Sequence, residues 1–357
     1  MADKDGNNPA IKGRGTSSNP ANRYAATRTE KFNDGWWEES TSFNPRTITT
    51  PVSSKTIIST NRSPDIPFDQ SINPYIGCEH GCIYCYARPS HAYWDLSPGI
   101  DFETHILTKP EGPDLLVKEL SKKSYVCKPI HIGANTDPYQ PVEKKLGITR
   151  ALLEVMKEFR QPFSIITKSS LILRDLDLLA ELSRDNLCSV AVSVTSLSNE
   201  LKRIMEPRTS TPAERLKTIT ALSEHNIPVS VFTAPIIPFI NDHEMESILE
   251  ASARAGASAA RYVFLRLPLE IESLFEEWLE SHFPLKRDHV MSLIRQSRGG
   301  MSYQSKFGER MTGTGIFADL INKRFNTACN KFGLSINSEA CLNTNLFGRP
   351  DRQHKLF

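Results

Sequence analysis

Residues 72–86 read INPYIGCEHGCIYCY, and this stretch decides the fold. Cys78, Cys82 and Cys85 form a C-x-x-x-C-x-x-C motif directly after an apolar segment that predicts a strand. Soft sulfur ligands select zinc, copper(I) or an iron–sulfur cluster. A structural zinc site uses four protein ligands and an ordinary four-iron cluster uses four cysteines, whereas only three cysteines are local here. We therefore expect an iron–sulfur cluster in which one iron has no cysteine ligand. That open iron can bind another ligand.

A zinc site is the alternative that the three cysteines leave open. His80 and His91 could supply the missing ligand, although His80 lies within the loop, where its geometry would be awkward. Such a chain would be a non-enzymatic zinc or iron–sulfur binding module. An iron–sulfur protein is brown and a zinc protein is colourless, so colour separates the two hypotheses.

The segments around this loop alternate between short apolar runs and helical periodicity. The expected strands are 70–76, 129–134, 163–168, 189–195, 229–234 and 261–265, and the expected helices are 149–159, 174–182, 213–225 and 243–255, the last capped by Asp242. Buried strands that alternate with helices predict a parallel sheet with crossover connections. Six such units fit either a partial barrel or an open doubly wound sheet.

Composition limits the class of protein. Of 357 residues, 43 are basic and 41 are acidic, and the net charge of +2 excludes a strongly basic nucleic-acid coat and an acidic disordered chain. Seven cysteines are too few for a disulfide scaffold and predict a reducing compartment. The start of the chain lacks the apolar run of a signal peptide, and no apolar stretch is long enough to cross a bilayer. We therefore expect a cytoplasmic protein without a membrane span.

Three regions are expected along the chain. Residues 1–65 carry few aliphatic side chains and predict a largely disordered N-terminal arm, because they cannot bury enough surface to offset the entropy of ordering. Residues 66–295 should form the core barrel, and residues 296–357 a C-terminal extension with a helix over 316–332. Four aromatic residues of the arm should pack onto its own domain or, alternatively, engage a partner: Phe32, Trp36, Trp37 and Phe43.

The cysteine motif, with the aromatic Tyr84 directly before Cys85, resembles that of the radical S-adenosylmethionine superfamily. Residues 71–89 and the text TDPYQP at 136–141 resemble, more narrowly, the enzymes related to spore photoproduct lyase, often named DNA-repair-photolyase-like. The resemblance covers roughly residues 60–295. It implies an α/β fold, a partial (β/α)6 TIM-like barrel, with the site at the C-terminal ends of the strands.

The resemblance also implies the cofactors. In this superfamily three cysteines hold a [4Fe–4S] cluster, and S-adenosyl-L-methionine binds the open iron. The reduced cluster cleaves S-adenosylmethionine to a 5′-deoxyadenosyl radical, which abstracts a hydrogen atom from the substrate, while the protein positions the cofactor and excludes side reactions. Cys78, Cys82 and Cys85 are then the cluster ligands, and a reductant such as flavodoxin or ferredoxin supplies the electron.

Two strand ends carry residues that the resemblance assigns to S-adenosylmethionine. Tyr84 resembles the aromatic residue that contacts adenine, the alternative being packing within the loop. Thr136 and Asp137 follow the second strand, where the superfamily binds the methionine amino group, although the usual Gly-Gly-Glu text is absent. The alternative for Asp137 is a local Asp-Pro turn. Gln140 and Glu143 follow and should reach the same mouth of the barrel.

Three further residues lie at or after the next strand ends. Lys168 ends the third strand, where a cation can pair with the methionine carboxylate. Ser193 lies in the fourth strand and, by the same resemblance, helps to bind the carboxylate or the ribose. Arg208 follows in the text Glu-Pro-Arg and should meet the carboxylate or a substrate phosphate. For all three the alternative is a solvated position.

The sequence departs from the family at one point. Spore photoproduct lyase carries a cysteine beside the second-strand motif as hydrogen donor, whereas residues 133–136 read GANT. Direct reversal of the spore photoproduct is therefore in doubt, and a different substrate is expected. Of the other cysteines, Cys188 should lie in the core, and Cys329 and Cys341 are too few for a second cluster.

Short sequence features indicate possible substrates and binding partners. Damaged DNA is one substrate class, and modified RNA, a peptide or a metabolite are the alternatives. The C-terminal residues Gln353, Leu356 and Phe357 resemble the peptide by which bacterial repair proteins dock on the polymerase sliding clamp, the alternative being an ordinary C-terminus. Two basic clusters could meet a nucleic acid at the mouth or be ordinary helix faces: Lys202, Arg203, Arg208, Arg215 and Lys217, and Lys144, Lys145 and Arg150.

Overall fold

The computed structural model describes residues 11–24, 45–336 and 341–350. An eight-stranded sheet with the order β11-β10-β9-β8-β7-β6-β3-β2 forms its centre. All neighbouring strands are parallel except β2 and β3. The strands are β2 (Ile58–Thr60), β3 (Gln70–Ile72), β6 (Ile130–Ile132), β7 (Phe163–Thr167), β8 (Cys188–Ser193), β9 (Val229–Ile236), β10 (Ala259–Phe264) and β11 (Ser335–Ile336).

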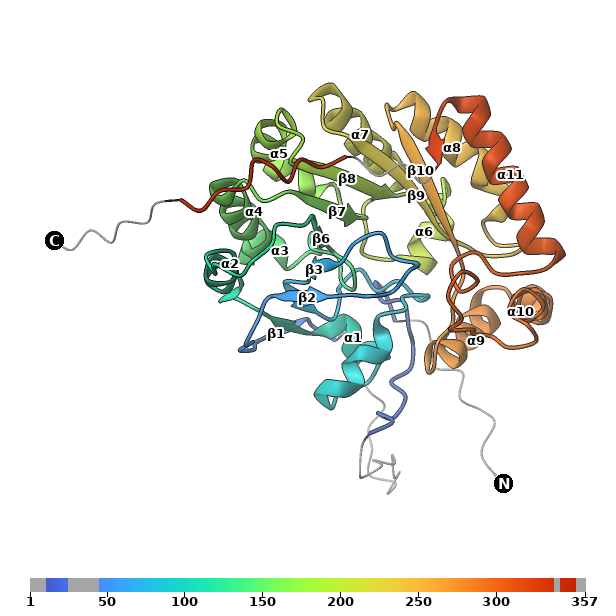
Figure 1. Cartoon of the computed structure of the whole chain (residues 1–357). Helices are drawn as coiled ribbons and strands as arrows, with labels where there is room; N and C mark the ends of the chain where they lie inside the picture. Colours follow the sequence, from blue (N-terminus) through green and yellow to red (C-terminus); the bar gives the residue numbers. More distant parts are fainter. Residues whose placement is uncertain (1–10, 25–44, 337–340, 351–357) are drawn as a thin grey trace, which may run out of the picture.

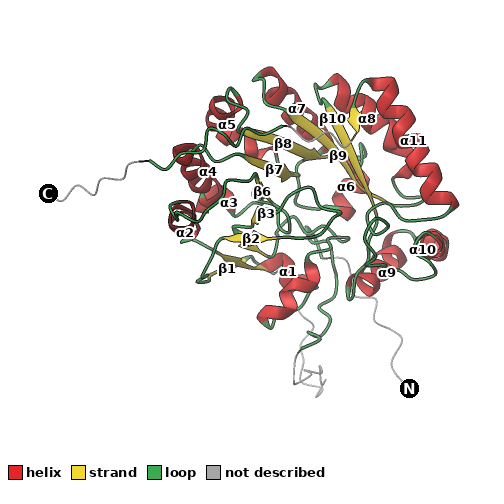
Figure 2. Cartoon of the chain, viewed as in Figure 1, coloured by secondary structure: helices red, strands yellow, loops and turns green. Residues whose placement is uncertain are grey.

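Crossover helices join the parallel strands and cover the outer face of the sheet, as Figures 1 and 2 show. This arrangement confirms the α/β class and the partial, TIM-like barrel, since the six expected strands lie side by side as β3 and β6 to β10. The helices are α1 (Ile100–Thr104), α2 (Gly112–Leu120), α3 (Glu143–Leu146), α4 (Ile148–Phe159), α5 (Leu176–Ser183), α6 (Asn199–Met205), α7 (Pro212–Glu224), α8 (Met245–Arg254), α9 (Ile271–His282), α10 (Arg287–Gln296) and α11 (Ile316–Phe332).

The strand expected over 70–76 is two strands in different sheets. β3 ends at Ile72, and β4 (Tyr75–Ile76) pairs with β5 (His105–Thr108) in a small sheet of order β1-β5-β4, where β1 is Ile48–Pro51. Pro74 lies at the break. Proline has no N–H to donate to a strand ladder, so it favours an interruption of the strand here. The break directs the chain from the barrel into the cysteine loop.

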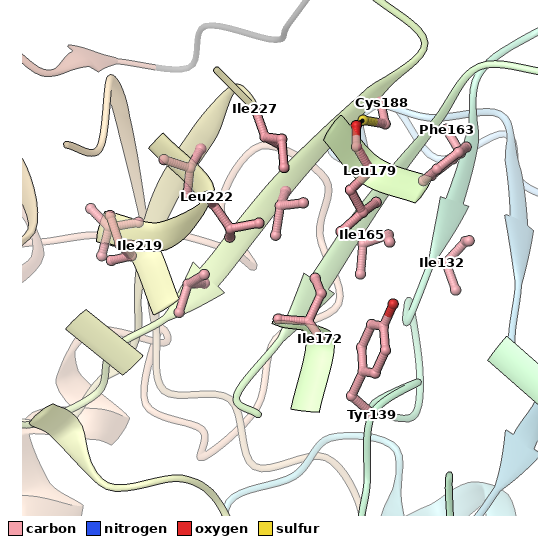
Figure 3. Packing of buried hydrophobic residues seen from close by; sticks show 14 of the residues in the cluster. Ile132, Tyr139, Phe163, Ile165, Ile172, Leu179, Cys188, Ile219, Leu222 and Ile227 are labelled. Carbon is pink, nitrogen blue, oxygen red and sulfur yellow. Dashed lines mark hydrogen bonds between the residues drawn. The ribbon is translucent and has the colours of Figure 1, made fainter. Parts of the chain in front are cut away.

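The two faces of the sheet differ in character. Ile132, Phe163 and Ile165 point outward from β6 and β7 and meet Leu179 of α5 in the fully buried core of Figure 3. Burial of a side chain such as Ile165 contributes about 2 kcal/mol. Residues that alternate with these point to the interior of the barrel and are smaller or polar. His131, Ser164 and Ser189 are in register there, and His131 Nδ1 lies 2.9 Å from Ser164 Oγ.

The helix boundaries lie within two residues of the expected ones, and one expected cap is missing. Helix α11 has the expected bounds, and α4 begins one residue before the expected start. The cap expected from Asp242 is absent: α8 begins at Met245 after a 3-10 turn, and Glu244 is its N-cap residue without a side-chain hydrogen bond. The Asp242 carboxylate instead lies 3.7 Å from Arg324 of α11. A tertiary ion pair therefore replaces the local cap.

Two parts of the N-terminal arm, residues 11–24 and 45–65, contact the folded core. β1 and β2 pair with β5 and β3, and Ile57 is 1% exposed in the main core. Arg14 Nη1 donates to the Glu103 carbonyl at 2.8 Å. Backbone pairing and polar contacts therefore order a segment that has few apolar side chains of its own. The four aromatic residues of the arm lie outside the described residues.

The C-terminal extension returns across the end of the barrel where the strands begin. Residues 341–350 are irregular, as expected for this region. Gly348 N donates to the Phe159 carbonyl at 3.0 Å, and the Phe347 ring lies 5.4 Å from that of Tyr125. Gln353, Leu356 and Phe357 lie outside the described residues.

Candidate active site

The cysteine motif forms a tight loop that starts where β4 ends. Gly77 and Gly81 have φ angles of 86° and 67°, which residues with a side chain rarely adopt. A Cβ atom added to Gly77 would lie 2.8 Å from His91 Cε1, and one added to Gly81 would lie 2.6 Å from Glu103 Oε2. The loop therefore requires glycine at both positions.

Gln140 fastens this loop to the segment after β6. Its Oε1 accepts from the Glu79 N–H at 2.9 Å, and its Nε2 donates to the Gly77 carbonyl at 3.1 Å. The Arg208 N–H donates to the His80 carbonyl at 3.2 Å from the other side. The loop conformation is thus held by residues that are distant in sequence.

Glu143, expected at the mouth together with Gln140, has a different place. Its carboxylate is fully buried and accepts from the Tyr75 hydroxyl and from the Thr149 N–H at 3.0 Å. Arg174 pairs with it at 2.7 Å. Glu143 therefore joins β4 to α4 beneath the loop.

The N-terminal segment lies directly against the cysteine loop. The N–H groups of Gly15 and Thr16 donate to the Glu103 carboxylate at 2.9 and 3.1 Å. The same carboxylate pairs with Arg88 at 2.6 Å, and both side chains are fully buried. A Cβ atom added to Gly15 would lie 1.7 Å from the Gly81 carbonyl oxygen. The backbone at Gly15 thus covers the loop at contact distance.

The three thiols of the loop are free and largely enclosed. Cys78 and Cys82 are buried, and Cys85 is half-buried against both. Burial, and then the neighbouring Asp137 and the other two thiols, raise the pKa of Cys78 well above its usual value. Burial also raises the pKa of Cys82 to about 12. Thiolates this disfavoured are stabilised by a bound cationic metal, so the donor set fits an iron–sulfur cluster.

The two histidines of the zinc alternative have contacts of their own. Within the described ranges, no group of three or more His, Cys, Asp or Glu residues could hold one metal ion. His80 Nδ1 lies 3.4 Å from the Asp137 carboxylate, and His91 Nε2 lies 3.0 Å from the His105 carbonyl. A cluster does not require the three thiols to meet at one point, because each binds a different iron.

Asp137 joins the ends of β6 and β7 beside the loop. Its Oδ1 accepts from Thr167 Oγ1 at 2.7 Å and from the Tyr139 N–H at 2.9 Å, and its Oδ2 accepts from the Lys168 N–H at 2.7 Å. Burial opposes its ionisation, but His80 and these donors outweigh burial and lower the pKa to about 2. The local turn that was the alternative is present, and the carboxylate has little capacity left for a ligand.

Lys168 points its ammonium group toward the loop. Lys168 Nζ lies 5.9 Å from the centroid of the Tyr84 ring. Its charge acts on Cys82 and Cys85, where it favours the thiolates. No ion pair within 4 Å is formed by this ammonium within the described residues, although its charge also acts on the buried Glu206 carboxylate.

Glu206 is a site residue that the sequence analysis quoted but did not select. Its buried carboxylate accepts from the Tyr84 hydroxyl, pairs with Arg215, and accepts from Thr195 Oγ1 at 2.8 Å. Burial opposes its ionisation, but Arg215 and Lys168 outweigh burial and lower the pKa to about 2. The network fixes the Tyr84 ring that lies next to Lys168.

Two other predicted residues lie in the same surroundings. Thr136 is 3% exposed, and its Oγ1 donates to the Tyr75 carbonyl at 2.8 Å. Ser193 ends β8 and is 1% exposed, and its carbonyl accepts from Arg215 Nη1 at 3.0 Å. Thr136 and Ser193 are therefore enclosed rather than solvated.

Three arginines of the basic clusters pair with carboxylates of this chain. Arg215 is buried against Glu206, and Arg208 lies 3.2 Å from the Glu79 carboxylate. Arg150 pairs with two aspartates of the following turn and helix. These contacts favour the alternative of ordinary charged positions over a basic stripe at the mouth.

The other cysteines lie away from the loop. Cys188 is fully buried in the main core, as expected. Cys329 is buried there too, on α11, whereas Cys341 is exposed. Burial raises the pKa of Cys127 to about 11.

Comparison with known proteins decides the family. A sequence model of the radical SAM superfamily matches residues 72–251, from β3 to α8. The chain belongs to the radical SAM superfamily. It is accordingly a radical SAM enzyme, and the superfamily implies an iron–sulfur cluster and S-adenosylmethionine. None of the described helices is long and apolar enough to span a membrane.

Two relatives found by sequence comparison are named only as uncharacterized proteins. An uncharacterized protein of Mycobacterium tuberculosis (strain ATCC 25618 / H37Rv) is 36% identical over 233 residues, which cover 65% of this chain and 68% of the relative. An uncharacterized protein of Methanocaldococcus jannaschii is 30% identical over 213 residues, covering 60% and 76%.

Solved structures show the fold. Spore photoproduct lyase complexed with dinucleoside spore photoproduct aligns with a TM-score of 0.56 and 14% identity, over 81% of each chain. A mutant of that lyase with bound AdoMet and dinucleoside spore photoproduct aligns with a TM-score of 0.54. The expected spore photoproduct lyase-like fold is therefore confirmed.

Proposed function

We propose that this radical SAM enzyme holds a [4Fe–4S] cluster on Cys78, Cys82 and Cys85 and uses S-adenosyl-L-methionine to start hydrogen-atom abstraction from a substrate. One observation carries the proposal: three enclosed thiols lie near the ammonium of Lys168, whose charge acts on two of them. A cluster held by these cysteines would supply one electron for cleavage of the sulfonium, which gives methionine and a 5′-deoxyadenosyl radical.

Lys168 has the central role in binding S-adenosylmethionine. Its ammonium pairs with the methionine carboxylate, as a charge-assisted hydrogen bond in an enclosed site. Asp137 is a positioning residue, because it fixes the Lys168 backbone and has little capacity left for the cofactor. Tyr84 offers its ring to the adenine, and Glu206 holds that ring in place.

Three further residues complete the proposed binding site. Ser193 and Thr136 offer hydroxyl groups to the ribose and the methionine portion from the ends of β8 and β6. Arg208 shares its charge between Glu79 and the cofactor. A reductant such as flavodoxin or ferredoxin delivers the electron.

Damaged DNA is the substrate class that the likeness to spore photoproduct lyase supports. The absence of a cysteine in residues 133–136 argues against reversal of the spore photoproduct itself. RNA, a peptide or a metabolite are the alternatives. We also propose that the protein resides in the cytoplasm and docks on a sliding clamp through Gln353, Leu356 and Phe357. Its core barrel is proposed to span residues 66–295, followed by an extension over 296–357.

The experiment is an anaerobic assay. The protein is reconstituted with iron and sulfide, reduced with dithionite and given S-adenosylmethionine, and 5′-deoxyadenosine is measured by mass spectrometry. We expect product from the wild type and none from a variant with Cys78, Cys82 and Cys85 all changed to Ala. A matched variant is Cys341→Ala, which removes an exposed thiol and should leave the product unchanged. Equal product from the triple variant would refute the proposal.

A further inference from the structure

Arg266 lies at the end of the last long barrel strand, between the cysteine loop and the C-terminal extension. It follows β10 by two residues. Its guanidinium carbon lies 5.4 Å from the ring centroid of Tyr86 and 5.8 Å from that of Tyr303. Tyr86 directly follows Cys85, so Arg266 stands next to the proposed cluster site.

The guanidinium of Arg266 has no oxygen acceptor within the described residues. Its one hydrogen-bond contact there runs from Nη1 to the sulfur of Met311, at 3.4 Å. A thioether is a weak acceptor, and Nε is buried without any partner. A buried donor that lacks an acceptor is costly, whereas a guanidinium can serve a carboxylate or phosphate through two parallel bonds.

A second guanidinium increases this positive charge. Arg298 is fully buried, and its hydrogen bonds go to backbone carbonyls, among them those of Phe264 and Leu265. Burial, and then the charge of Arg266, lower the pKa of Arg298 to about 10. No carboxylate within the described ranges pairs with either arginine, so two like charges lie close together without a counterion.

The surroundings of Arg266 are open to a ligand. The Tyr86 side chain is 48% exposed although it adjoins the enclosed thiols, and its hydroxyl donates to the Ala134 carbonyl. Tyr303 and Arg266 are partly exposed. Two aromatic rings and one guanidinium, none of them fully buried, thus lie together next to the cysteine loop.

We propose that Arg266 binds an oxyanion of the substrate, a phosphate or a carboxylate, at the mouth of the barrel. The proposal deepens the proposed function, because it names the substrate class of the same site. The rings of Tyr86 and Tyr303 hold the guanidinium in a fixed orientation, and Arg298 adds positive charge behind it. Lys168 remains the partner of the cofactor, so the two anions are bound by different cations.

The test measures binding of defined probes to the reconstituted protein under anaerobic conditions by titration calorimetry. Thymidylyl-thymidine carries one phosphodiester, succinate carries carboxylates, and thymidine carries the same base without charge. We expect thymidylyl-thymidine or succinate to bind the wild type, and its dissociation constant to rise by about tenfold in Arg266→Gln. Arg254→Gln is the matched control, because the Arg254 side chain is 79% exposed on α8 and pairs with Glu250.

Two further variants separate binding from folding. Arg266→Lys keeps the charge but loses the two parallel hydrogen bonds, so its affinity for the anion should lie between those of the wild type and Arg266→Gln. If Arg266 were only a structural cation–π partner, the three affinities would not follow this order. Tyr303→Phe keeps the ring and should bind as the wild type does. Binding of thymidylyl-thymidine assigns a phosphodiester, and binding of succinate alone assigns a carboxylate.

Two outcomes would overturn the proposal. One is that neither anion binds the wild type at millimolar concentration. The other is that Arg266→Gln keeps every affinity within about twofold of the wild type. The proposed function is judged separately, by 5′-deoxyadenosine formed by the wild type without any probe, so failure of one proposal is distinguishable from failure of the other.

Discussion

The carboxylate of Asp137 accepts a hydrogen bond of 2.7 Å from the backbone N–H of Lys168. This bond joins the segment after β6 to the end of β7. It fixes the backbone from which the Lys168 ammonium extends toward Tyr84 and the cysteines. The position of the cation that we assign to S-adenosylmethionine therefore depends on a residue of the neighbouring strand end.

Lys168→Ala should weaken binding of S-adenosylmethionine by about tenfold or more, because the methionine carboxylate loses its charged partner. The brown colour and iron content of the reconstituted protein should stay as in the wild type. Equilibrium binding of S-adenosylmethionine to reconstituted protein is the measurement. The control is Lys157→Ala, which removes an exposed lysine paired with Glu181. Loss of iron from Lys168→Ala would contradict the role given to Lys168.

Asp137→Asn should also weaken binding of S-adenosylmethionine, but by less than Lys168→Ala, because it displaces the cation rather than removing it. An amide group has one oxygen to offer where the carboxylate uses two, so one of the donors around it loses its acceptor. We expect the double variant to bind no more weakly than Lys168→Ala alone. Additive losses of affinity in the double variant would show that Asp137 acts independently of Lys168.

Glu206 should make the stability of the chain depend on acid pH. Its pKa is lowered to about 2 in the fold, below the usual value of 4.5, so its stabilising effect is complete above about pH 4.5 and is lost as the pH falls toward 2. Asp137 acts in the same direction and over a similar range. Urea unfolding of the cluster-free chain at several pH values should show a smaller loss of stability on acidification for Glu206→Gln than for the wild type. Parallel curves for the two proteins would argue against the buried pair of Glu206 with Arg215.

Gly15→Val should detach the N-terminal segment from the cysteine loop. The new side chain would overlap the Gly81 carbonyl, since a Cβ atom alone would lie 1.7 Å from its oxygen. Such overpacking costs about 1–3 kcal/mol, and release of the segment is the cheaper response. We expect faster proteolysis within residues 11–24 and faster loss of iron in air. Gly348→Ala, with nothing within 4 Å of the added Cβ, is the control. An unchanged rate of iron loss would mean that the segment does not shield the loop.

The sequence predicted the barrel well, because its signals are local. The alternation of β-rich runs with helical periodicity located six neighbouring strands, and the bounds of α11 were correct. The break at Pro74 and the first turn of α8 were missed. Both depend on partners elsewhere in the fold, namely β5 and Arg324.

The candidate site was predictable only in part. The cysteine motif is contiguous and could be read directly, and Lys168 was found through its place at a strand end. Glu206 lies beside Arg208 in the sequence but was not predicted as a site residue. Its carboxylate points inward because it pairs with the buried Arg215, a contact that the local sequence does not indicate. Arg266 had no signal at all, since the rings that flank it lie 180 residues before and 37 residues after it in the sequence.

The path of residues 341–350 has a consequence for how the enzyme could be tethered. The segment crosses the start of the strands, with Asn343 bonded to the Asn186 carbonyl and Arg349 to that of Lys122, whereas the cysteine loop lies where the strands end (Figure 1). A group attached at a residue of the described segment 341–350 would therefore lie on the side of the barrel opposite its mouth. An enzyme immobilised through one of these residues would keep its substrate entrance facing away from the support.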